Sequence, residues 1–275
     1  MIAIGERING MFKDVRQAIA DKDPGPIVDL ARRQTEAGAA YLDVNVGTAA
    51  ADQESTMKWL VETVQGAVPT PVCLDSQKPA VIRAGLKACD TARGYVLNST
   101  PLAKKSDPEV LDKYASMAQE SGGKLIALTM DSGGVPQTAE RRVEIAAQIV
   151  TKCLELGMTP ERRFIDPIIL PVNVPGAQGQ PSSILSAMDQ IRLMSDPPPH
   201  LVMGLSNLSQ GTTERPLING VFVAMAIGHG CDAAIVDVLD DALVDMVATA
   251  EMLMNKQIYS DSFLRAYRSI SGGQR

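Results

Sequence analysis

The stretch at residues 70–88, TPVCLDSQKPAVIRAGLKA, contains the structural unit from which the fold of this chain is predicted. Residues 70–74 form an apolar run of strand length, and the polar pair Asp75 and Ser76 follows it. Pro79 then opens a segment of helical character, and proline suits the first turn of a helix. The stretch therefore predicts a buried strand, a polar loop and a helix.

The same order of strand and helix occurs eight times along the 275 residues. The predicted strands are residues 2–8, 41–46, 70–74, 95–97, 124–130, 164–165, 201–205 and 233–238. The predicted helices, or their core-facing stripes, cover residues 26–37, 57–64, 79–88, 108–120, 143–154, 182–194, 216–227 and 243–253. Leu154 and Leu253 are assigned to such core-facing stripes. Eight units of buried strand and amphipathic helix favour a TIM (β/α)8 barrel over an open doubly wound sheet. We expect one barrel domain at residues 1–265 and a C-terminal tail at residues 266–275.

Composition and charge exclude several classes of protein. The chain is 45% apolar, which suits a single large core, and its net charge of -6 opposes a nucleic-acid-binding surface. The first residues become charged too soon for a signal peptide, and no apolar run is long enough for a membrane span. We therefore expect a soluble, cytoplasmic protein. Four scattered cysteines and only two histidines argue against a metal site, a disulfide or a Ser-His-Asp triad.

Four predicted strands end in polar residues of two chemical types. Asp75 and Asp166 supply carboxylates, whereas Asn98 and Asn207 supply amides. The C-terminal ends of all strands in a TIM barrel open onto one mouth, so these side chains are predicted to share one pocket. Each alone would also suit a helix cap or a turn, but independent caps have no reason to combine both types on one face.

This combination of side chains fits a planar heterocycle with an amino-amidine edge. An ionised carboxylate only accepts hydrogen bonds, whereas an amide both donates and accepts. Adjacent N–H groups of such a ligand would donate to a carboxylate, while its ring nitrogen and its carbonyl group would pair with the amides. A pterin has this edge.

Seven motifs lie at or just beyond the predicted strands. They are Ile4-Gly5-Glu6-Arg7-Ile8-Asn9-Gly10, Leu42-Asp43-Val44-Asn45-Val46-Gly47, Cys73-Leu74-Asp75-Ser76, Asn98-Ser99-Thr100, Ile165-Asp166-Pro167, Gly204-Leu205-Ser206-Asn207-Leu208-Ser209-Gln210 and Arg215-Pro216-Leu217-Ile218-Asn219. Over nearly the whole chain they resemble the methyltetrahydrofolate:corrinoid protein methyltransferases. That family shares a pterin-binding barrel with dihydropteroate synthase and with the folate domain of cobalamin-dependent methionine synthase.

The resemblance implies a role for each polar strand end. Asp75, Asn98 and Asp166 would hold the polar edge of the pterin. Asn207 would lie near N5, the nitrogen that carries the methyl group, and Arg215 near the same end. The residues implied to shape the pocket, its floor or its wall are Gly204, Ser206, Glu6, Asn9, Asp43 and Asn45. Of these, Asp43 also fits a purely structural role.

The implied activity is a reversible methyl transfer between N5 of methyltetrahydrofolate and the cobalt of cob(I)alamin. The chain has no Asp-x-His-x-x-Gly motif for a corrinoid, so a separate corrinoid protein would supply the cobalamin at the barrel mouth. The long Pro- and Gly-rich connection at residues 167–181 would be a contact for that protein. By its length it is either a functional lid or a rigid crossover. The resemblance also implies a homodimer, for which helix faces with exposed Met and Leu would be suitable.

Three other functions are open on the sequence alone. A dihydropteroate synthase-like transferase would need cations at the mouth for a diphosphate, yet residues 236–241, VDVLDD, are acidic. A non-catalytic folate-binding module would have no use for Asn207 beside N5. A sugar-phosphate barrel would need a Gly-rich phosphate cradle, which SQGTT at residues 209–213 matches only weakly. Nucleotide-binding folds lose their main support because neither G-x-G-x-x-G nor a P-loop follows any predicted strand.

Overall fold

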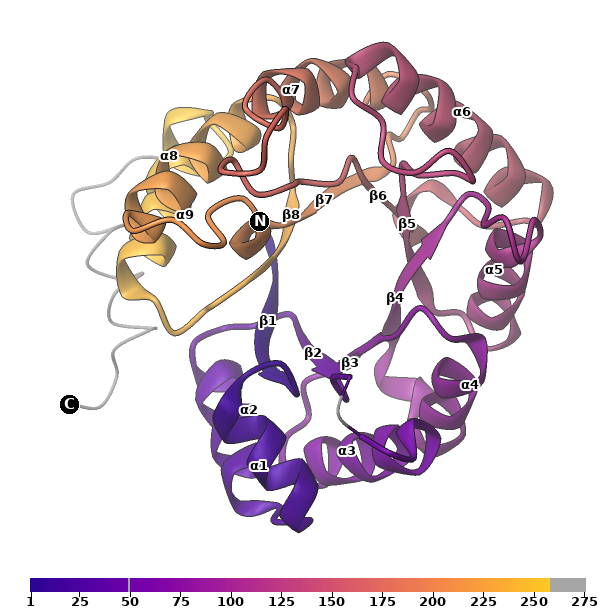
Figure 1. The fold of residues 1–275 in the computed structure, drawn as a ribbon, viewed down its shortest axis with the longest axis vertical. Helices are drawn as coiled ribbons and strands as arrows, with labels where there is room; N and C mark the ends of the chain where they lie inside the picture. Colours follow the sequence, from indigo (N-terminus) through magenta and orange to yellow (C-terminus); the bar gives the residue numbers. More distant parts are fainter. Residues whose placement is uncertain (49, 258–275) are drawn as a thin grey trace.

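Eight parallel strands close into a barrel in the computed structural model, which describes residues 1–48 and 50–257 (Figure 1). The strands pair in chain order, and β8 returns to pair with β1. Their bounds are β1 (Ile2–Asn9), β2 (Tyr41–Asn45), β3 (Val72–Asp75), β4 (Tyr95–Pro101), β5 (Lys124–Leu128), β6 (Arg163–Asp166), β7 (His200–Gly204) and β8 (Ala233–Val236). The predicted TIM barrel is confirmed.

Helices surround the barrel on its outside (Figure 1). Over the described residues the α-helices are α1 (Lys13–Asp21), α2 (Gly25–Glu36), α3 (Gln53–Ala67), α4 (Pro79–Ala88), α5 (Val110–Glu120), α6 (Ala139–Glu155), α7 (Gln180–Ile191), α8 (Arg215–Gly228) and α9 (Asp241–Leu253). Short 3-10 helices are η1 (Thr91–Arg93), η2 (Pro160–Arg162) and η3 (Leu205–Asn207). Proline stands in the first turn of α2, α4, α7 and α8, where its missing N–H removes no helical hydrogen bond. None of these helices is long and apolar enough to cross a bilayer.

The core has two layers, because successive side chains of a strand point to opposite faces. Side chains that face outward pack with the apolar stripes of the helices into one large cluster. Those that face inward fill the barrel, and they are Ile4, Cys73, Val96, Ile126, Phe164, Val202 and Ala233. The interior is therefore solid beneath the mouth.

Polar and aromatic side chains close the N-terminal end of the barrel. Lys124, the first residue of β5, donates from Nζ to the Tyr41 hydroxyl at 2.7 Å. Phe164 stacks on the ring of His200 with 4.5 Å between centroids, and His200 Nδ1 lies 2.7 Å from Asp232 Oδ2. These contacts fill the N-terminal end of the barrel, so the polar strand ends at the opposite end are the expected ligand site.

Two details of the helices differ from the sequence-based expectation. Helix α1 is additional, and its nine residues bury only Val15, Ala18 and Ile19, too few to make a clear periodic pattern. Leu154 and Leu253 are 60% and 75% exposed, so their assignment to core-facing stripes is wrong. Both lie in the last turn of their helix, where the inward face is already occupied by earlier residues. The expected tail at residues 266–275 lies outside the described residues.

Candidate active site at the barrel mouth

The polar ends of four neighbouring strands lie side by side. Register pairs Asn9 in β1 with Asn45 in β2, Asn45 with Asp75 in β3, and Asp75 with Asn98 in β4. Parallel strands in this register bring the four residues to one level at the C-terminal end of the barrel. Asp43 precedes Asn45 by two residues, so it faces the same side one level below.

Hydrogen bonds join these strand ends to Asp43. Asn45 donates from Nδ2 to Asp75 Oδ2 at 2.6 Å, and Asn98 donates from Nδ2 to Asp43 Oδ1 at 3.0 Å. The carboxyl groups of Asp43 and Asp75 are hydrogen-bonded to each other. The backbone N–H of Gly47 donates to Asn45 Oδ1 at 2.7 Å and fixes the orientation of that amide. Four of the predicted site residues therefore form one connected cluster.

Burial controls the charge of the two carboxyl groups. Loss of water is the main reason that the pKa of Asp43 is raised well above its ordinary value, and the neighbouring Asp75 charge raises it further. Burial also raises the pKa of Asp75, to about 6, against the hydrogen bonds from Asn45 and Asp43. Burial thus favours the protonated form of both carboxyl groups, and Asp75, with a pKa of about 6, is mostly ionised at neutral pH.

Asp166 ends β6 on the adjacent side of the mouth, where it pairs with Leu128 of β5. Its side chain is buried, and its Oδ1 accepts the backbone N–H of Ile168 at 2.7 Å. Burial raises the pKa of Asp166 to about 7, although the Ile168 N–H and the charge of Arg142 oppose the shift. A ligand that donates hydrogen bonds to this carboxyl would favour its charged form.

Arg142, on α6, fixes both ends of the connection between β6 and α7. Its guanidinium is fully buried and donates from Nε to the Pro167 carbonyl at 2.8 Å. From Nη2 it donates to Gln180 Oε1 at 2.9 Å, and from Nη1 to the Thr138 carbonyl at 3.2 Å. Pro167 directly follows Asp166, so Arg142 holds the backbone that carries this carboxyl group.

We expect Arg142→Met to lower the free energy of unfolding by about 3 kcal/mol, because two buried acceptors, on Pro167 and Gln180, lose a charged donor while the apolar volume is largely kept. Urea denaturation followed by circular dichroism would measure the change. Arg141→Met is the matched control, since Arg141 is exposed and pairs only with Asp131 and Glu144. That surface variant should change stability by less than about 1 kcal/mol. Equal losses in the two variants would contradict the role of Arg142.

A second polar cluster connects β1 to the loop after β7. Ser206 Oγ donates to Glu6 Oε1 at 2.7 Å, and Arg215 Nη2 donates to the Ser206 carbonyl at 3.4 Å. Burial raises the pKa of Glu6, the charge of Asp237 adds to the shift, and Ser206 and Arg215 oppose it. With Glu6 and Asp237 close together, this side of the mouth is acidic and would repel a diphosphate.

Asn207 lies in η3, one turn beyond the end of β7, and is exposed. A Cβ placed on Gly204 would be 3.0 Å from Asn207 Nδ2, so the absent side chain of Gly204 leaves room for this amide. The φ of Gly204 is -84°, an ordinary value, so space and not backbone geometry requires glycine here. The Asn207 amide is thus a hydrogen-bond donor open to the mouth.

Asn9 has a local role that the motif alone does not reveal. Its Oδ1 accepts the backbone N–H of Met11 at 2.9 Å, which stabilises the turn after β1. The backbone N–H of Gly10 donates to the Asn45 carbonyl at 2.9 Å, and a Cβ on Gly10 would lie 2.5 Å from the Val46 carbonyl oxygen. The first two loops of the mouth can touch only because this position is glycine.

Comparison with known proteins identifies the family. A family model described as pterin binding enzyme matches residues 12–237, which is most of the barrel. The chain belongs to the pterin-binding enzyme family. The resemblance indicated by the motifs is thereby confirmed, and the chain is an enzyme of this barrel type.

Two curated relatives are at least 30% identical to this chain. A methylcorrinoid:tetrahydrofolate methyltransferase from Eubacterium limosum is 32% identical over 270 residues, covering 98% of this chain and 96% of the relative. A methionine synthase from Mycobacterium tuberculosis is 30% identical over 246 residues, covering 86% of this chain. The match spans only 20% of that methionine synthase, so the pterin-binding chain corresponds to one part of it.

Two solved structures of dihydropteroate synthases have the same fold as this chain. The enzyme from Xanthomonas albilineans with 4-aminobenzoic acid superposes with a TM-score of 0.64 at 16% identity, covering 94% of this chain and 93% of that one. The enzyme from Thermus thermophilus in complex with 6HMPPP superposes with a TM-score of 0.60 at 18% identity, covering 94% of each chain. At these identities the likeness shows the barrel fold alone.

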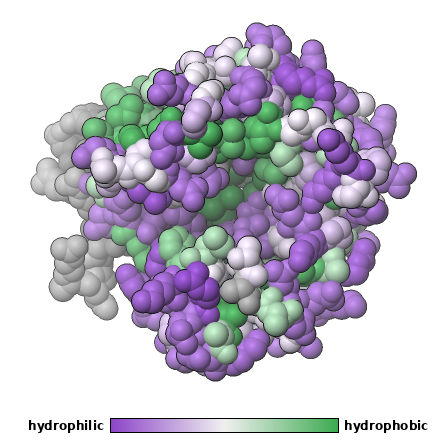
Figure 2. All heavy atoms as spheres, in the orientation of Figure 1, coloured by the Kyte–Doolittle hydropathy of each residue, from purple (hydrophilic) through white to green (hydrophobic). Residues whose placement is uncertain are grey.

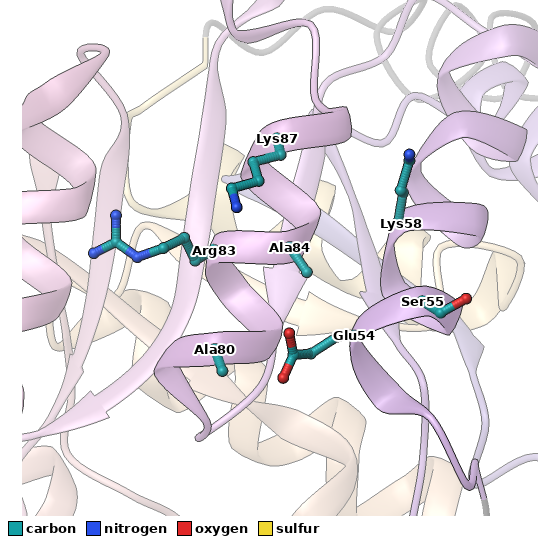
Figure 3. A pocket seen from close by; sticks show the side chains of 7 residues that line it. All are labelled: Glu54, Ser55, Lys58, Ala80, Arg83, Ala84 and Lys87. Atoms are coloured by element: carbon teal, nitrogen blue, oxygen red, sulfur yellow. The ribbon is translucent and has the colours of Figure 1, made fainter.

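A surface groove lies between the outer helices α3 and α4 (Figure 3). Its volume is about 350 Å³, and it is lined by Glu54, Ser55, Lys58, Ala80, Arg83, Ala84 and Lys87. Lys58 and Arg83 each lie 3.8 Å from a glutamate, Glu62 and Glu120. The groove contains none of the strand-end residues, so it is a feature of the outer helical surface.

Two residues around the barrel mouth were not among the sequence-predicted set. Arg142 clamps the segment after Asp166, and Cys73 pairs with Asp43 in the register of β2 and β3, where its thiol is hydrogen-bonded to the Asp43 carboxyl group. Arg142 has a signal in the sequence, since it precedes the buried Ile145 and Ile149 by three and seven residues on one helix face. A charged residue at a core-facing position indicates a buried polar contact.

Proposed function

We propose that the chain is a methyltransferase that moves a methyl group between N5 of tetrahydrofolate and the cobalt of a separate corrinoid protein. The observation that carries the proposal is the convergence of Asp75, Asn98 and Asp166 at one barrel mouth, with the Asn207 amide at its rim. The similarity to the methylcorrinoid:tetrahydrofolate methyltransferase of Eubacterium limosum, which extends over 98% of this chain, supports the same activity. We also expect the enzyme to be cytoplasmic.

The mouth is suited to bind the polar edge of a reduced pterin. In their ionised forms, the carboxylates of Asp75 and Asp166 accept hydrogen bonds from adjacent N–H groups of the ligand. Asn98 has a carbonyl oxygen and an amide that serve the remaining polar atoms of that edge. Gly204 and Ser206 bound the pocket near the rim, where Asn207 and Arg215 face the N5 end of the ring. Glu6, Asn9, Asp43 and Asn45 complete its floor and wall.

Asn207 activates N5 in this proposal. During transfer from folate the bond between N5 and the methyl carbon breaks, its electron pair stays on N5, and the methyl carbon bonds to cobalt. The tertiary amine is a poor leaving group unless N5 gains a proton or a strong hydrogen bond. The Asn207 amide donates that hydrogen bond as negative character develops, while the proton itself comes through water or an acid of the mouth. The reverse transfer uses the same contacts.

The corrinoid belongs to the partner and supplies the nucleophile, a reduced cobalt. Both histidines of this chain are engaged away from the mouth. His200 stacks on Phe164 at the closed end of the barrel, and His229, at the C-terminal end of α8, pairs with Asp189 at 2.8 Å. The chain therefore contributes the folate site and the docking rim, including the connection between β6 and α7.

Absorbance measurements test the function directly. We expect the purified chain to accelerate formation of methylcobalamin from methyltetrahydrofolate and cob(I)alamin in a stopped-flow experiment. A chain that binds the folate but gives no acceleration would be a non-catalytic folate-binding module. Condensation of a pterin pyrophosphate with 4-aminobenzoate, under the same conditions, would instead support a dihydropteroate synthase-like transferase. Absence of folate binding would contradict the proposal as a whole.

Affinity for methyltetrahydrofolate is expected to rise about twentyfold from pH 6 to pH 8, about tenfold from Asp166 and about twofold from Asp75. The pKa of Asp166 is about 7 and that of Asp75 about 6, and the ionised forms are the ones that accept hydrogen bonds from the ligand. Each pH unit below the relevant pKa weakens binding by about a factor of ten. Fluorescence titration at constant ionic strength would measure the affinity, with circular dichroism as the control for folding. A flat profile would show that neither carboxyl group accepts from the ligand.

The homodimer expected for this enzyme would use the outer face of α8. After Arg215 this helix has no charged residue, and Leu217, Val221 and Met225 are 61%, 49% and 48% exposed. Hydrophobic surface gathers over α8 at the upper left of Figure 2. A helix that is apolar on both faces is normally covered on both.

Val221→Glu is therefore expected to convert the dimer to a monomer, because it places a charge inside the apolar contact. Analytical ultracentrifugation would give the mass. Leu193→Glu is the matched control, since Leu193 lies just beyond α7 and is 79% exposed. A monomeric wild-type chain, or a dimer lost equally in both variants, would contradict the assignment of α8.

A further inference from the structure

We propose, on the basis of the function above, that Asp43 is a positioning residue that acts as a neutral carboxylic acid. Its proton bridges to Asp75, and its other oxygen holds the amide of Asn98. In this way one buried acid fixes the orientation of two groups that contact the pterin, the Asp75 carboxylate and the Asn98 amide. From the floor of the pocket it acts through these two groups, and it does not supply the proton to N5.

The position of Asp43 allows these contacts and little else. The residue is only 2% exposed and lies one level below the strand ends, between β1 and β3. Asn98 Nδ2 donates to its Oδ1 at 3.0 Å, and its carboxyl group is hydrogen-bonded to that of Asp75. Two carboxyl groups can share a hydrogen bond only when one of them carries a proton.

The surroundings assign that proton to Asp43. The groups that face it are Asp75 and Cys73 from β3, Asn98 from β4 and Glu6 from β1. Burial and the two neighbouring acids raise the pKa of Asp43, whereas the hydrogen bonds from Asn98 and Cys73 only partly oppose them. Asp75 lies closer to the open mouth, and its pKa of about 6 leaves it mostly charged at neutral pH.

The consequence for the pterin site is a fixed set of hydrogen-bonding directions. Because the Nδ2 of Asn98 points to Asp43, the carbonyl oxygen of the same amide points away from it. Asp75 is held from two sides, by Asn45 and by Asp43, so its carboxylate keeps one orientation. Preorganised groups of this kind bind a ligand more tightly because less freedom is lost on binding.

Asp43→Asn and Asp43→Ala separate this role from the alternatives. Asparagine can accept from Asn98 and donate to Asp75 as the neutral acid does, so Asp43→Asn should bind methyltetrahydrofolate within about threefold of wild type and keep most of its turnover. Alanine can do neither, so Asp43→Ala should bind at least tenfold more weakly. At alkaline pH the wild-type affinity should fall as Asp43 ionises beside Asp75, and Asp43→Asn should lack this fall.

The outcomes that overturn the inference are distinct. If Asp43→Asn is as impaired in binding as Asp43→Ala, the carboxylate itself is required. If Asp43→Asn binds normally but loses turnover, Asp43 is a proton donor and not a positioning residue.

Should the alanine variant fail to fold, infrared difference spectra of wild type against Asp43→Asn at neutral pH provide the decisive measurement. The C=O stretch of a protonated carboxylic acid must be present in wild type. If wild type itself binds no folate, the proposed function fails instead.

Discussion

Asn207→Ala is expected to slow methyl transfer by about two orders of magnitude or more while the affinity for methyltetrahydrofolate falls much less. A single preorganised donor that acts mainly in the transition state contributes about 2.7 to 4 kcal/mol, by analogy with oxyanion-hole donors. The Asn207 amide is exposed at the mouth and is not part of the buried clusters that shape the pocket. Its removal should therefore affect the reaction and leave most binding contacts intact.

Single-turnover formation of methylcobalamin would give the rate, and fluorescence titration the affinity. Asn207→Asp is the matched variant, because it keeps the size of the side chain but has no N–H to donate. It should be as slow as Asn207→Ala. Gly204→Ala should be slower than wild type, since its Cβ would lie 3.0 Å from Asn207 Nδ2 and must displace the amide. Wild-type rates in Asn207→Ala would remove this residue from the mechanism.

Periodicity made the barrel predictable from the sequence. Buried parallel strands are short apolar runs, and their helices carry apolar residues at helical spacing, so both kinds of element are visible without homologues. The stripe of Met57, Leu60, Val61 and Val64 is fully buried as expected. Helix ends are less predictable, because only some side chains of the last turn face the barrel. In α6 Cys153 is buried, whereas the next residue, Leu154, is 60% exposed.

The site was predictable in part, for a topological reason. Strand ends of a closed parallel barrel meet at one mouth, so Asp75, Asn98 and Asp166 could be grouped from their places after apolar runs. Their pairings could not be predicted, because the hydrogen bond between Asn98 and Asp43 depends on the register of three strands. The contact of Arg142 with Pro167 depends on the path of a long connection, which no local pattern specifies.

Asp166→Asn is expected to stabilise the folded chain at pH 8 and to weaken folate binding at least a hundredfold. The pKa of Asp166 is about 7 in the folded chain, against about 3.9 for an unperturbed aspartate. A pKa raised by folding means that stability is fully present below about pH 4 and is lost as pH rises toward 7. At pH 8 the buried charge lowers stability by about 4 kcal/mol, of which a neutral amide should recover roughly half.

Urea denaturation of both proteins at pH 5 and pH 8 tests the stability, and titration with methyltetrahydrofolate tests the binding. The stability difference between Asp166→Asn and wild type should be small at pH 5 and large at pH 8, because the wild-type carboxyl group is mostly protonated at the lower pH. Binding falls because an amide N–H2 or a neutral oxygen replaces a carboxylate that accepts charge-assisted hydrogen bonds. Two outcomes would show that the buried charge is not maintained for the ligand. One is a variant that is less stable than wild type at both pH values, and the other is a variant that binds folate as wild type does. A gain in stability with a loss of binding would show that this enzyme keeps a destabilising group at the mouth because the pterin requires it.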